Sequence, residues 1–277
     1  RYRHFQRQVQ CNQYVKQSVM LKNSLIALLD QTFPSVNMLF SSPPRKGDGH
    51  EKWIDFVGKF WHFECVNSLS KNVFTQRYQK WCKRTGYNFL STKAAAIYDF
   101  ACIQVSTLPR STFAKQLITQ AVSQLNSLSE TLALIRQQML SLASGLPEFP
   151  VVMAMQGVGN VLGPQLMAEI GDVRRFNRKQ SLVAFAGIDA PPFQSGAFEA
   201  QSTGISKRGS SSLRKTLFQV MDCLLKHAPS HDAVFQCLDK KRGEGKHYYV
   251  YMMAGANKFL RIYYARVKEH LGSLAVQ

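Results

Sequence analysis

A polar stretch between Pro191 and Arg214 gathers several residues that could do chemistry. It reads PPFQSGAFEAQSTGISKRGSSSLR and contains six serines, one threonine and three glycines. A serine that attacks phosphorus must lie on an accessible loop, and cationic groups must offset the charge of the phosphoryl transition state. Lys207, Arg208, Arg214 and Lys215 could supply that charge. Two interpretations remain open: one serine is a nucleophile, or the serines only cap a helix and keep a surface loop soluble.

The serines closest to the end of this loop have a structural alternative. Apolar side chains recur at helical spacing directly after it, at Leu213, Leu217, Val220, Met221, Leu224 and Leu225. A serine just before such a helix accepts hydrogen bonds from its free backbone amides. Ser206 or Ser210 is therefore expected to cap this helix, whereas Arg214 and Lys215 lie off its apolar stripe.

The loop belongs to a C-terminal domain predicted over residues 148–277, and this domain is predicted to be mainly helical. Phe176, Leu182, Val183 and Phe185 are predicted to be core residues, and a helix in this segment is expected to end at Gly187. A last helix is predicted from about residue 246 to 270. Four basic residues are predicted on its solvent side: Lys258, Arg261, Arg266 and Lys268.

Two glycines one residue apart lie near the start of this domain. Gly157 and Gly159 occur in VMAMQGVGNVLGPQLMAEIGDV, between an apolar stretch and an amphipathic helix. This arrangement matches a helix-hairpin-helix element, whose exposed amides can hold a phosphate without reading sequence. The same glycines could form a plain turn between helices, and the sequence favours neither interpretation.

The rest of the chain is predicted to form an arm with an insert. Residues 1–35 have a basic, helix-compatible pattern, and residues 36–110 are predicted to form a small helical insert. Residues 111–147 have the four-and-three spacing of a long coiled-coil arm. The seam positions are Ala114, Ile118, Ala121, Leu125, Leu128, Leu132, Ile135, Met139 and Leu142. Because few charges flank this seam, its partner can be the first helix, another subunit in a dimer or tetramer, or both.

Aromatic residues alternate with lysines and arginines in the insert, as in FTQRYQKWCKRTGYNF. Such aromatics more often form a core, although they can also stack on RNA bases while the cations hold phosphates. Glu51 and Asp55, four residues apart, are expected on a solvated helix face. His62, Cys65 and Cys82 lack a fourth ligand at the usual spacing, so no metal site is predicted.

The whole chain is strongly basic. Its 35 Lys and Arg against 17 Asp and Glu give a net charge of +18, which favours a nucleic-acid partner. No apolar run approaches the roughly 20 residues of a membrane-spanning helix, so no membrane association is expected. The six cysteines form no paired framework and are typical of reduced thiols in the cytoplasm.

Several motifs occur in an order that resembles a known family. The segments GVG, AEIGDVRRF, LVAFAGIDAP, QSG, GISKRGSSSLRKTL and KFLR follow one another between residues 148 and 265. They resemble the C-terminal domain of insertion-sequence transposases of the IS-one-ten family, which are bridge-RNA-guided DNA recombinases related to Piv-type invertases. The LLDQTFP helix and the arm resemble the middle region of that family.

The resemblance implies a reaction and a site. In the family, the serine of the SG pair that follows the AGL.P motif joins covalently to DNA. Ser195, after AGIDAP, occupies that position here. Pro191 and Pro192 favour extended chain before it, and Gly196 lets the backbone bend beside a phosphate. The resemblance also implies Mg²⁺ as cofactor, DNA and a guide RNA as partners, and a bacterial cytoplasmic, nucleoid-associated location. The alternative is a non-catalytic, nucleic-acid-binding remnant of such a transposase.

The sequence departs from the family pattern in two ways. The spacer between SG and ISK carries Glu199 where members are often basic, so strong phosphate contacts from the spacer are not expected. Members also have an N-terminal RNase H-like domain (RuvC type) with a carboxylate tetrad for divalent metal, and no acid before residue 148 lies on a strand pattern of that kind. The Mg²⁺ ligands are therefore expected in a missing segment or a separate chain, and this chain alone is expected to be inactive.

Overall fold

The structure is a computed structural model that describes residues 2–190, 194–195, 198–199 and 204–274. This part of the chain divides into two compact units. The arm unit comprises Cys11–Ile135, and the C-terminal unit comprises Arg1–Gln10 together with Arg136–Gln277. Helices α1 (Tyr2–Thr32) and α6 (Thr112–Ser144) run through both units. The fold is mainly α, as the sequence predicts.

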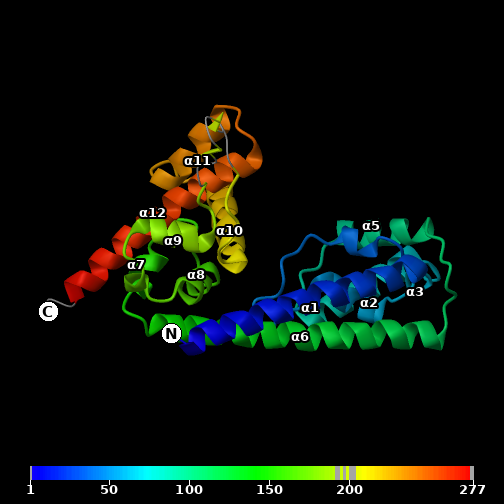
Figure 1. Cartoon of the computed structure of the whole chain (residues 1–277). Helices are drawn as coiled ribbons and strands as arrows, with labels where there is room; N and C mark the ends of the chain where they lie inside the picture. The colour runs from blue at the N-terminus through cyan, green and yellow to red at the C-terminus, as the bar shows by residue number, and fades with distance from the viewer. Residues whose placement is uncertain (1, 191–193, 196–197, 200–203, 275–277) are drawn as a thin grey trace. The chain divides into compact units, whose positions relative to one another are not determined.

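The arm unit is built on α1 and α6, which lie side by side (Figure 1). Leu25 of α1 shares one core with Ile118 of α6, and Tyr14 lines a shallow groove with Thr131. Later residues of α1 therefore lie beside earlier residues of α6, so the two helices are antiparallel. The insert between them contains η1 (Val36–Leu39), α2 (Lys52–Lys59), α3 (Glu64–Asn67), α4 (Lys71–Thr85) and α5 (Ser91–Cys102).

Aromatic side chains form the core of this insert. Those buried are Phe56, Phe60, Trp61, Phe74, Tyr78 and Trp81. They pack on one another, with ring centroids 4.8 Å apart for Phe56 and Phe60 and 5.7 Å apart for Tyr78 and Trp81. The aromatics of the insert are therefore mainly core residues, the first of the two interpretations.

His62 is fully buried in the same unit and is bound on both sides of its ring. Nε2 lies 3.2 Å from the carbonyl oxygen of Leu108, and Nδ1 accepts a hydrogen bond from the Glu64 amide at 3.1 Å. Burial lowers the pKa of His62. These contacts account for a histidine in the core without a metal.

The prediction of a solvated face for Glu51 and Asp55 is wrong. Glu51 forms an ion pair with Lys22 of α1. Asp55 accepts hydrogen bonds from the Tyr87 hydroxyl at 2.6 Å and from Asn126 Nδ2 at 2.7 Å. The donors lie far away in sequence, so the local spacing of the two acids could not reveal them.

The buried stripe of α6 differs from the predicted seam at three positions. Its members are Ala114, Ile118, Val122, Leu125, Ser129, Leu132, Ile135, Met139 and Ala143. Six of the predicted positions are among them. At the other three, Val122, Ser129 and Ala143 are buried in place of Ala121, Leu128 and Leu142. The mean step of this stripe is about 3.6 residues, the period of a straight α-helix, whereas a strict heptad seam has 3.5. The supercoil of a coiled-coil arm stays a prediction.

The C-terminal unit packs around the helices α10 (Ser211–His227) and α12 (Tyr248–Leu274). Its other elements are α7 (Phe149–Met153), α8 (Leu162–Ile170), η2 (Val173–Arg175), α9 (Lys179–Ala186) and α11 (Ala233–Gly243). Between α9 and α10, β1 (Gln194–Ser195) pairs antiparallel with β2 (Phe198–Glu199). A Cβ on Gly255 would lie 2.5 Å from Leu238 Cδ2 and 2.9 Å from Met221 Sδ, so α12 packs closely on α11 and α10.

Some features of individual helices agree with the predictions made from sequence, and others do not. Gly187 follows α9 with φ +65°, the left-handed conformation that glycine adopts without strain. Lys258, Arg261, Arg266 and Lys268 of α12 are exposed. Helix α11 was not predicted. No helix in the described residues is long and apolar enough to cross a membrane.

Candidate functional site

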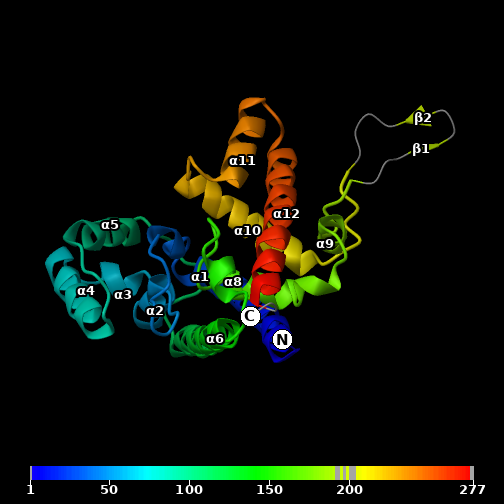
Figure 2. The ribbon, with the colours of Figure 1, turned by 90° about the vertical axis from the view of Figure 1, so that its left-hand side faces the viewer.

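Hydrogen bonds join the two limbs of the serine-rich loop where it leaves α9 and enters α10 (Figure 2). Three backbone amides donate across it: Ser206 N to Asp189 O at 2.8 Å, Lys207 N to Gly187 O at 3.0 Å, and Ser210 N to Phe185 O at 2.8 Å. The Ser206 hydroxyl also donates to Asp189 Oδ1 at 2.5 Å. We call residues 185–189 and 206–210 the neck. It fixes the base of the loop.

Two glycines allow the limbs of the neck to approach each other. A Cβ on Gly209 would lie 2.1 Å from Phe185 O and 2.5 Å from Gly187 N. A Cβ on Gly187 would lie 2.6 Å from Gly209 N. Lys207, between them on the second limb, has φ +54°, which is uncommon for a residue with a side chain. The neck therefore needs glycine at both positions and holds Lys207 in a constrained conformation.

The second limb runs directly into α10, and its serines are bound there. Ser210 is the N-cap and accepts from the Leu213 amide at 3.1 Å, as predicted for one of the two candidate serines. The Ser210 hydroxyl donates to Glu169 Oε2 at 3.2 Å, and the Ser212 hydroxyl donates to the other oxygen of Glu169. Glu169 of α8 is buried beside the start of α10, where the helix dipole favours a negative charge. Ser210 and Ser212 therefore have structural roles.

Arg214 binds the ends of two elements at once. Its Nη1 donates to Ala186 O at 2.9 Å and to Gly209 O at 3.1 Å. Ala186 is the last residue of α9, so the guanidinium satisfies a carbonyl that the helix leaves free. Arg214 thus ties α9, the neck and α10 together.

A groove of about 920 Å³ lies beside the neck, between the loop limbs, α10, α11 and α12. Four basic residues line it: Lys207, Arg214, Lys258 and Arg261. No carboxylate is among the described residues that line it. Its walls include the apolar side chains of Ile188, Phe218 and Met253. We call it the neck groove. Its charge and apolar walls suit an anion that also carries a planar or apolar part.

The neck groove brings together only part of the basic set predicted from sequence. Lys207 and Arg214 line it, whereas Arg208 and Lys215 are exposed outside its lining. Lys258 and Arg261 also line the site but are not predicted as members of it, because their spacing on an amphipathic helix indicates only a solvent-facing side. Their three-residue spacing in KFLR, which places both on one helix face, was the available signal.

Ser195 lies in β1, and its backbone pairs with that of Phe198 in β2. The Ser195 side chain is outside the part of the chain that the structure describes. Pro191, Pro192 and Gly196, whose backbone was expected to present this serine, also lie outside the described residues. The catalytic role of Ser195 therefore stays a prediction.

The glycines after α7 differ from each other in their surroundings. Gly157 has φ +77°, and a Cβ there would lie 2.9 Å from Leu224 Cγ and 3.0 Å from Val220 O. It therefore packs directly on α10. Gly159 is exposed with no such neighbour, and its carbonyl accepts from the Gly163 amide at 2.8 Å. Close packing explains Gly157, while phosphate binding at this turn stays a prediction.

The described residues do not provide a metal site. No three His, Cys, Asp or Glu side chains come together among them as a bound ion would require. These residues therefore do not fit the Mg²⁺ that the resemblance implies, and none of them is assigned to it.

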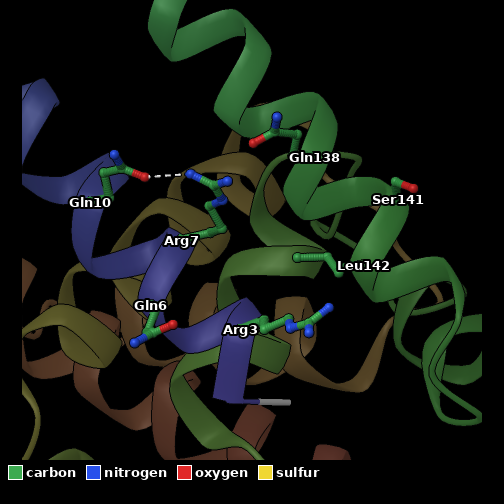
Figure 3. Close-up of a pocket in the computed structure, with 7 residues that line it drawn as sticks. All are labelled: Arg3, Gln6, Arg7, Gln10, Gln138, Ser141 and Leu142. Atoms are coloured by element: carbon green, nitrogen blue, oxygen red, sulfur yellow. Dashed lines mark hydrogen bonds between the residues drawn. The ribbon is translucent and has the colours of Figure 1, made fainter.

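A polar hollow lies between the segments of α1 and α6 that belong to the C-terminal unit (Figure 3). Its lining residues are Arg3, Gln6, Arg7, Gln10, Gln138, Ser141 and Leu142. Arg7 Nη1 donates to Gln10 Oε1 at 2.8 Å, which holds the guanidinium along α1. On the same turn of α1, burial lowers the pKa of His4 to about 4, so this histidine is neutral at pH 7. These side chains suit helix packing better than catalysis.

Comparisons with known proteins show that the segment containing the neck is similar to transposases. Residues 150–236 match a family model described as Transposase IS116/IS110/IS902 family. The chain is similar to the putative transposase y4rJ of Sinorhizobium fredii, with 34% identity over 88 residues. It is also similar to the transposase for insertion sequence element IS1111A of Coxiella burnetii, with 28% identity over 113 residues.

These similarities cover a limited part of each protein. The two alignments include 32% and 41% of this chain, but only 22% and 31% of the relatives. The chain thus spans less than a third of the length of the relatives it matches. The matched family segment includes the neck, Glu169 and all of α10. The similarity to the IS116/IS110/IS902 family of transposases is thus carried by residues 150–236.

Proposed function

We propose that the chain is part of a transposase that cuts and rejoins DNA, with Ser195 as the nucleophile. The observation that carries this proposal is the neck, which holds both limbs of the serine-rich loop beside a cationic groove. Catalytic residues are disproportionately found on loops that a rigid scaffold positions. The family match supports the transposase role.

The proposed reaction has two transfers at phosphorus. The Ser195 hydroxyl attacks a backbone phosphate, so a serine–phosphorus bond forms and the bond from phosphorus to one bridging oxygen of DNA breaks. A base takes the serine proton, and the departing oxygen gains one to become a hydroxyl. A hydroxyl of the joining strand then attacks the phosphoserine, a new phosphodiester forms, and Ser195 regains its proton. The number of ester bonds is conserved, so rejoining needs no external energy source.

The basic residues near the neck have three roles in this proposal. Lys207, Arg208 and Lys215 are exposed and would offset the charge of the phosphoryl transition state. Arg214 is a positioning residue, because its guanidinium holds the ends of α9 and the neck. Lys258 and Arg261 would bind flanking phosphates in the neck groove.

The other participants come from the family resemblance. A guide RNA would select the DNA, and Mg²⁺ would be held by carboxylates of an RNase H-like domain. Self-association as a dimer or tetramer would bring two DNA strands together. This chain by itself is proposed to be inactive.

The test measures the covalent intermediate. The chain is combined with an RNase H-like domain of the family, Mg²⁺, a guide RNA and target DNA, and the product is separated under denaturing conditions. Ser195→Ala removes one oxygen, and it is expected to abolish the protein–DNA adduct while DNA affinity changes less than about twofold. Ser202→Ala is the matched control and should retain the adduct. An adduct that survives Ser195→Ala and is lost with Ser202→Ala would show that the other serine is the nucleophile.

The alternative is a nucleic-acid-binding remnant without turnover. The net charge of +18 favours it as much as it favours the enzyme. The same assay separates the two proposals. A remnant would bind the DNA but would give no adduct even with the unaltered chain, in which Ser195 is present.

A further inference from the structure

We propose that a basic groove in the arm unit binds the phosphate backbone of a double-stranded nucleic acid. The groove measures about 1090 Å³ and lies where α2, α4, the chain before α6 and the start of α6 meet. Four of its basic residues lie on α4: Arg77, Lys80, Lys83 and Arg84. Three more come from other segments: Lys59, Arg110 and Lys115. We call it the α4 groove.

The charges of the α4 groove are not neutralised within the described chain. All seven basic side chains are exposed, and no carboxylate is among the described residues that line the groove. The described residues form no ion pair with any of the seven. Elsewhere in the arm unit, Lys22, Arg45 and Lys71 each pair with an acid. Unpaired charge is therefore gathered at this groove.

This arrangement is unfavourable for the isolated protein. Arg77, Lys80 and Arg84 follow one another at three and four residues on α4, where like charges destabilise a helix. Arg110 and Lys115 flank the N-terminus of α6, where the helix dipole also disfavours positive charge. Lys83 and Arg84 do complement the C-terminus of α4, but the other groups have no such benefit. An anionic partner would relieve the repulsion at all of these positions.

The aromatic residues of the groove indicate which part of a nucleic acid it binds. Phe60, Trp61 and Trp81 are only 4%, 6% and 5% exposed. The Trp81 ring already stacks on Tyr87, with centroids 5.5 Å apart. Single-stranded sites present free aromatic faces to successive bases, and this groove has none among these three residues. Its exposed cations suit the continuous phosphate backbone of a duplex, bound without regard to sequence.

The groove is independent of the proposed serine chemistry. All its lining residues lie in the arm unit, whereas Ser195 and the neck lie in the C-terminal unit. The proposal therefore stands or fails by binding alone.

The test compares two variants that carry the same net charge. The groove variant is Arg77→Gln, Lys80→Gln and Arg84→Gln in the full chain. The control variant is Lys16→Gln, Lys46→Gln and Arg136→Gln, three exposed residues outside the groove. Each change lowers the net charge from +18 to +15, because three positive charges are removed. Fluorescence anisotropy then measures binding to a 20-base-pair DNA duplex, an RNA duplex of the same sequence, and each single strand.

The groove variant is expected to weaken duplex binding at least about tenfold and to reduce the salt slope of log affinity by about 2 to 3. The control variant is expected to change affinity less than about threefold. The DNA and RNA arms show which duplex is preferred. Equal losses in both variants, tighter binding of single strands than of duplexes, or a preference for poly-glutamate over both duplexes would overturn the proposal.

A second variant separates loss of binding from loss of folding. Arg110→Gln with Lys115→Gln removes charges that oppose the α6 dipole, so it is expected to raise the melting temperature while it weakens duplex binding. Unchanged duplex binding in both this variant and the groove variant would also overturn the proposal.

Discussion

Single residues decide whether the serine-rich loop is held in place. The sequence predicts the helix cap, because a serine before an apolar stripe has a known local partner, and Ser210 confirms it. Glu169 could not be predicted as its companion, since the carboxylate comes from a helix about 40 residues earlier. The same holds for Asp55, whose two donors lie 32 and 71 residues away in sequence. Local patterns specify caps and turns, while long-range polar partners depend on packing.

Gly209→Ala tests the neck directly. An added Cβ would lie 2.1 Å from Phe185 O, a backbone atom that cannot move without opening the neck. We expect a loss of about 1–3 kcal/mol in the free energy of unfolding, measured by urea denaturation. Within the proposed function, adduct formation should also fall, because the loop base is displaced.

Gly204→Ala is the matched control for this change. A Cβ at Gly204 meets no atom within 4 Å, so the free energy of unfolding should change by less than about 0.5 kcal/mol. Equal stability of the Gly209 and Gly204 variants would show that the neck is not closely packed in solution.

At the scale of elements, the sequence predicts helices well and their partners poorly. The periodicity of α6 locates six of its nine buried positions, and Val122, Ser129 and Ala143 replace the other three. A four-and-three seam and a 3.6-residue stripe differ by only about one residue over about eight turns, so the pattern does not distinguish a supercoil from straight packing. The packing in the arm unit identifies α1 as one partner of α6, a choice that the uncharged flanks leave open.

Leu125→Ala measures how much this pairing stabilises the arm unit. Leu125 is fully buried in the core that includes Leu25 and Leu29 of α1. Truncation should cost about 2–5 kcal/mol in the free energy of unfolding, whereas Leu134→Ala, at a residue 54% exposed on the same helix, should cost less than about 0.5 kcal/mol. Light scattering of the same samples reports the mass. Unchanged stability with a lower mass for Leu125→Ala would mean that the stripe packs mainly between chains.

At the scale of the whole molecule, the positions of the basic residues indicate where a polyanion would bind, which the net charge alone does not. The composition favours a nucleic-acid partner but does not locate it. The structure gathers four cations at the neck groove and seven at the α4 groove, and it places one groove in each unit. The Lys and Arg of the insert signalled the second site in the sequence, although its aromatics are core residues. The described residues identify both candidate surfaces.

The salt dependence of binding tests the charge as a whole. If about six phosphates are neutralised, log affinity for duplex DNA should fall against log salt concentration with a slope near −5. Doubling the salt concentration would then weaken binding about 30-fold. Circular dichroism at each salt concentration verifies that the helices are retained, so that the change reports binding rather than unfolding. A flat titration would mean that the cations of both grooves only solubilise the protein, and it would contradict both the α4 groove and phosphate binding at the neck.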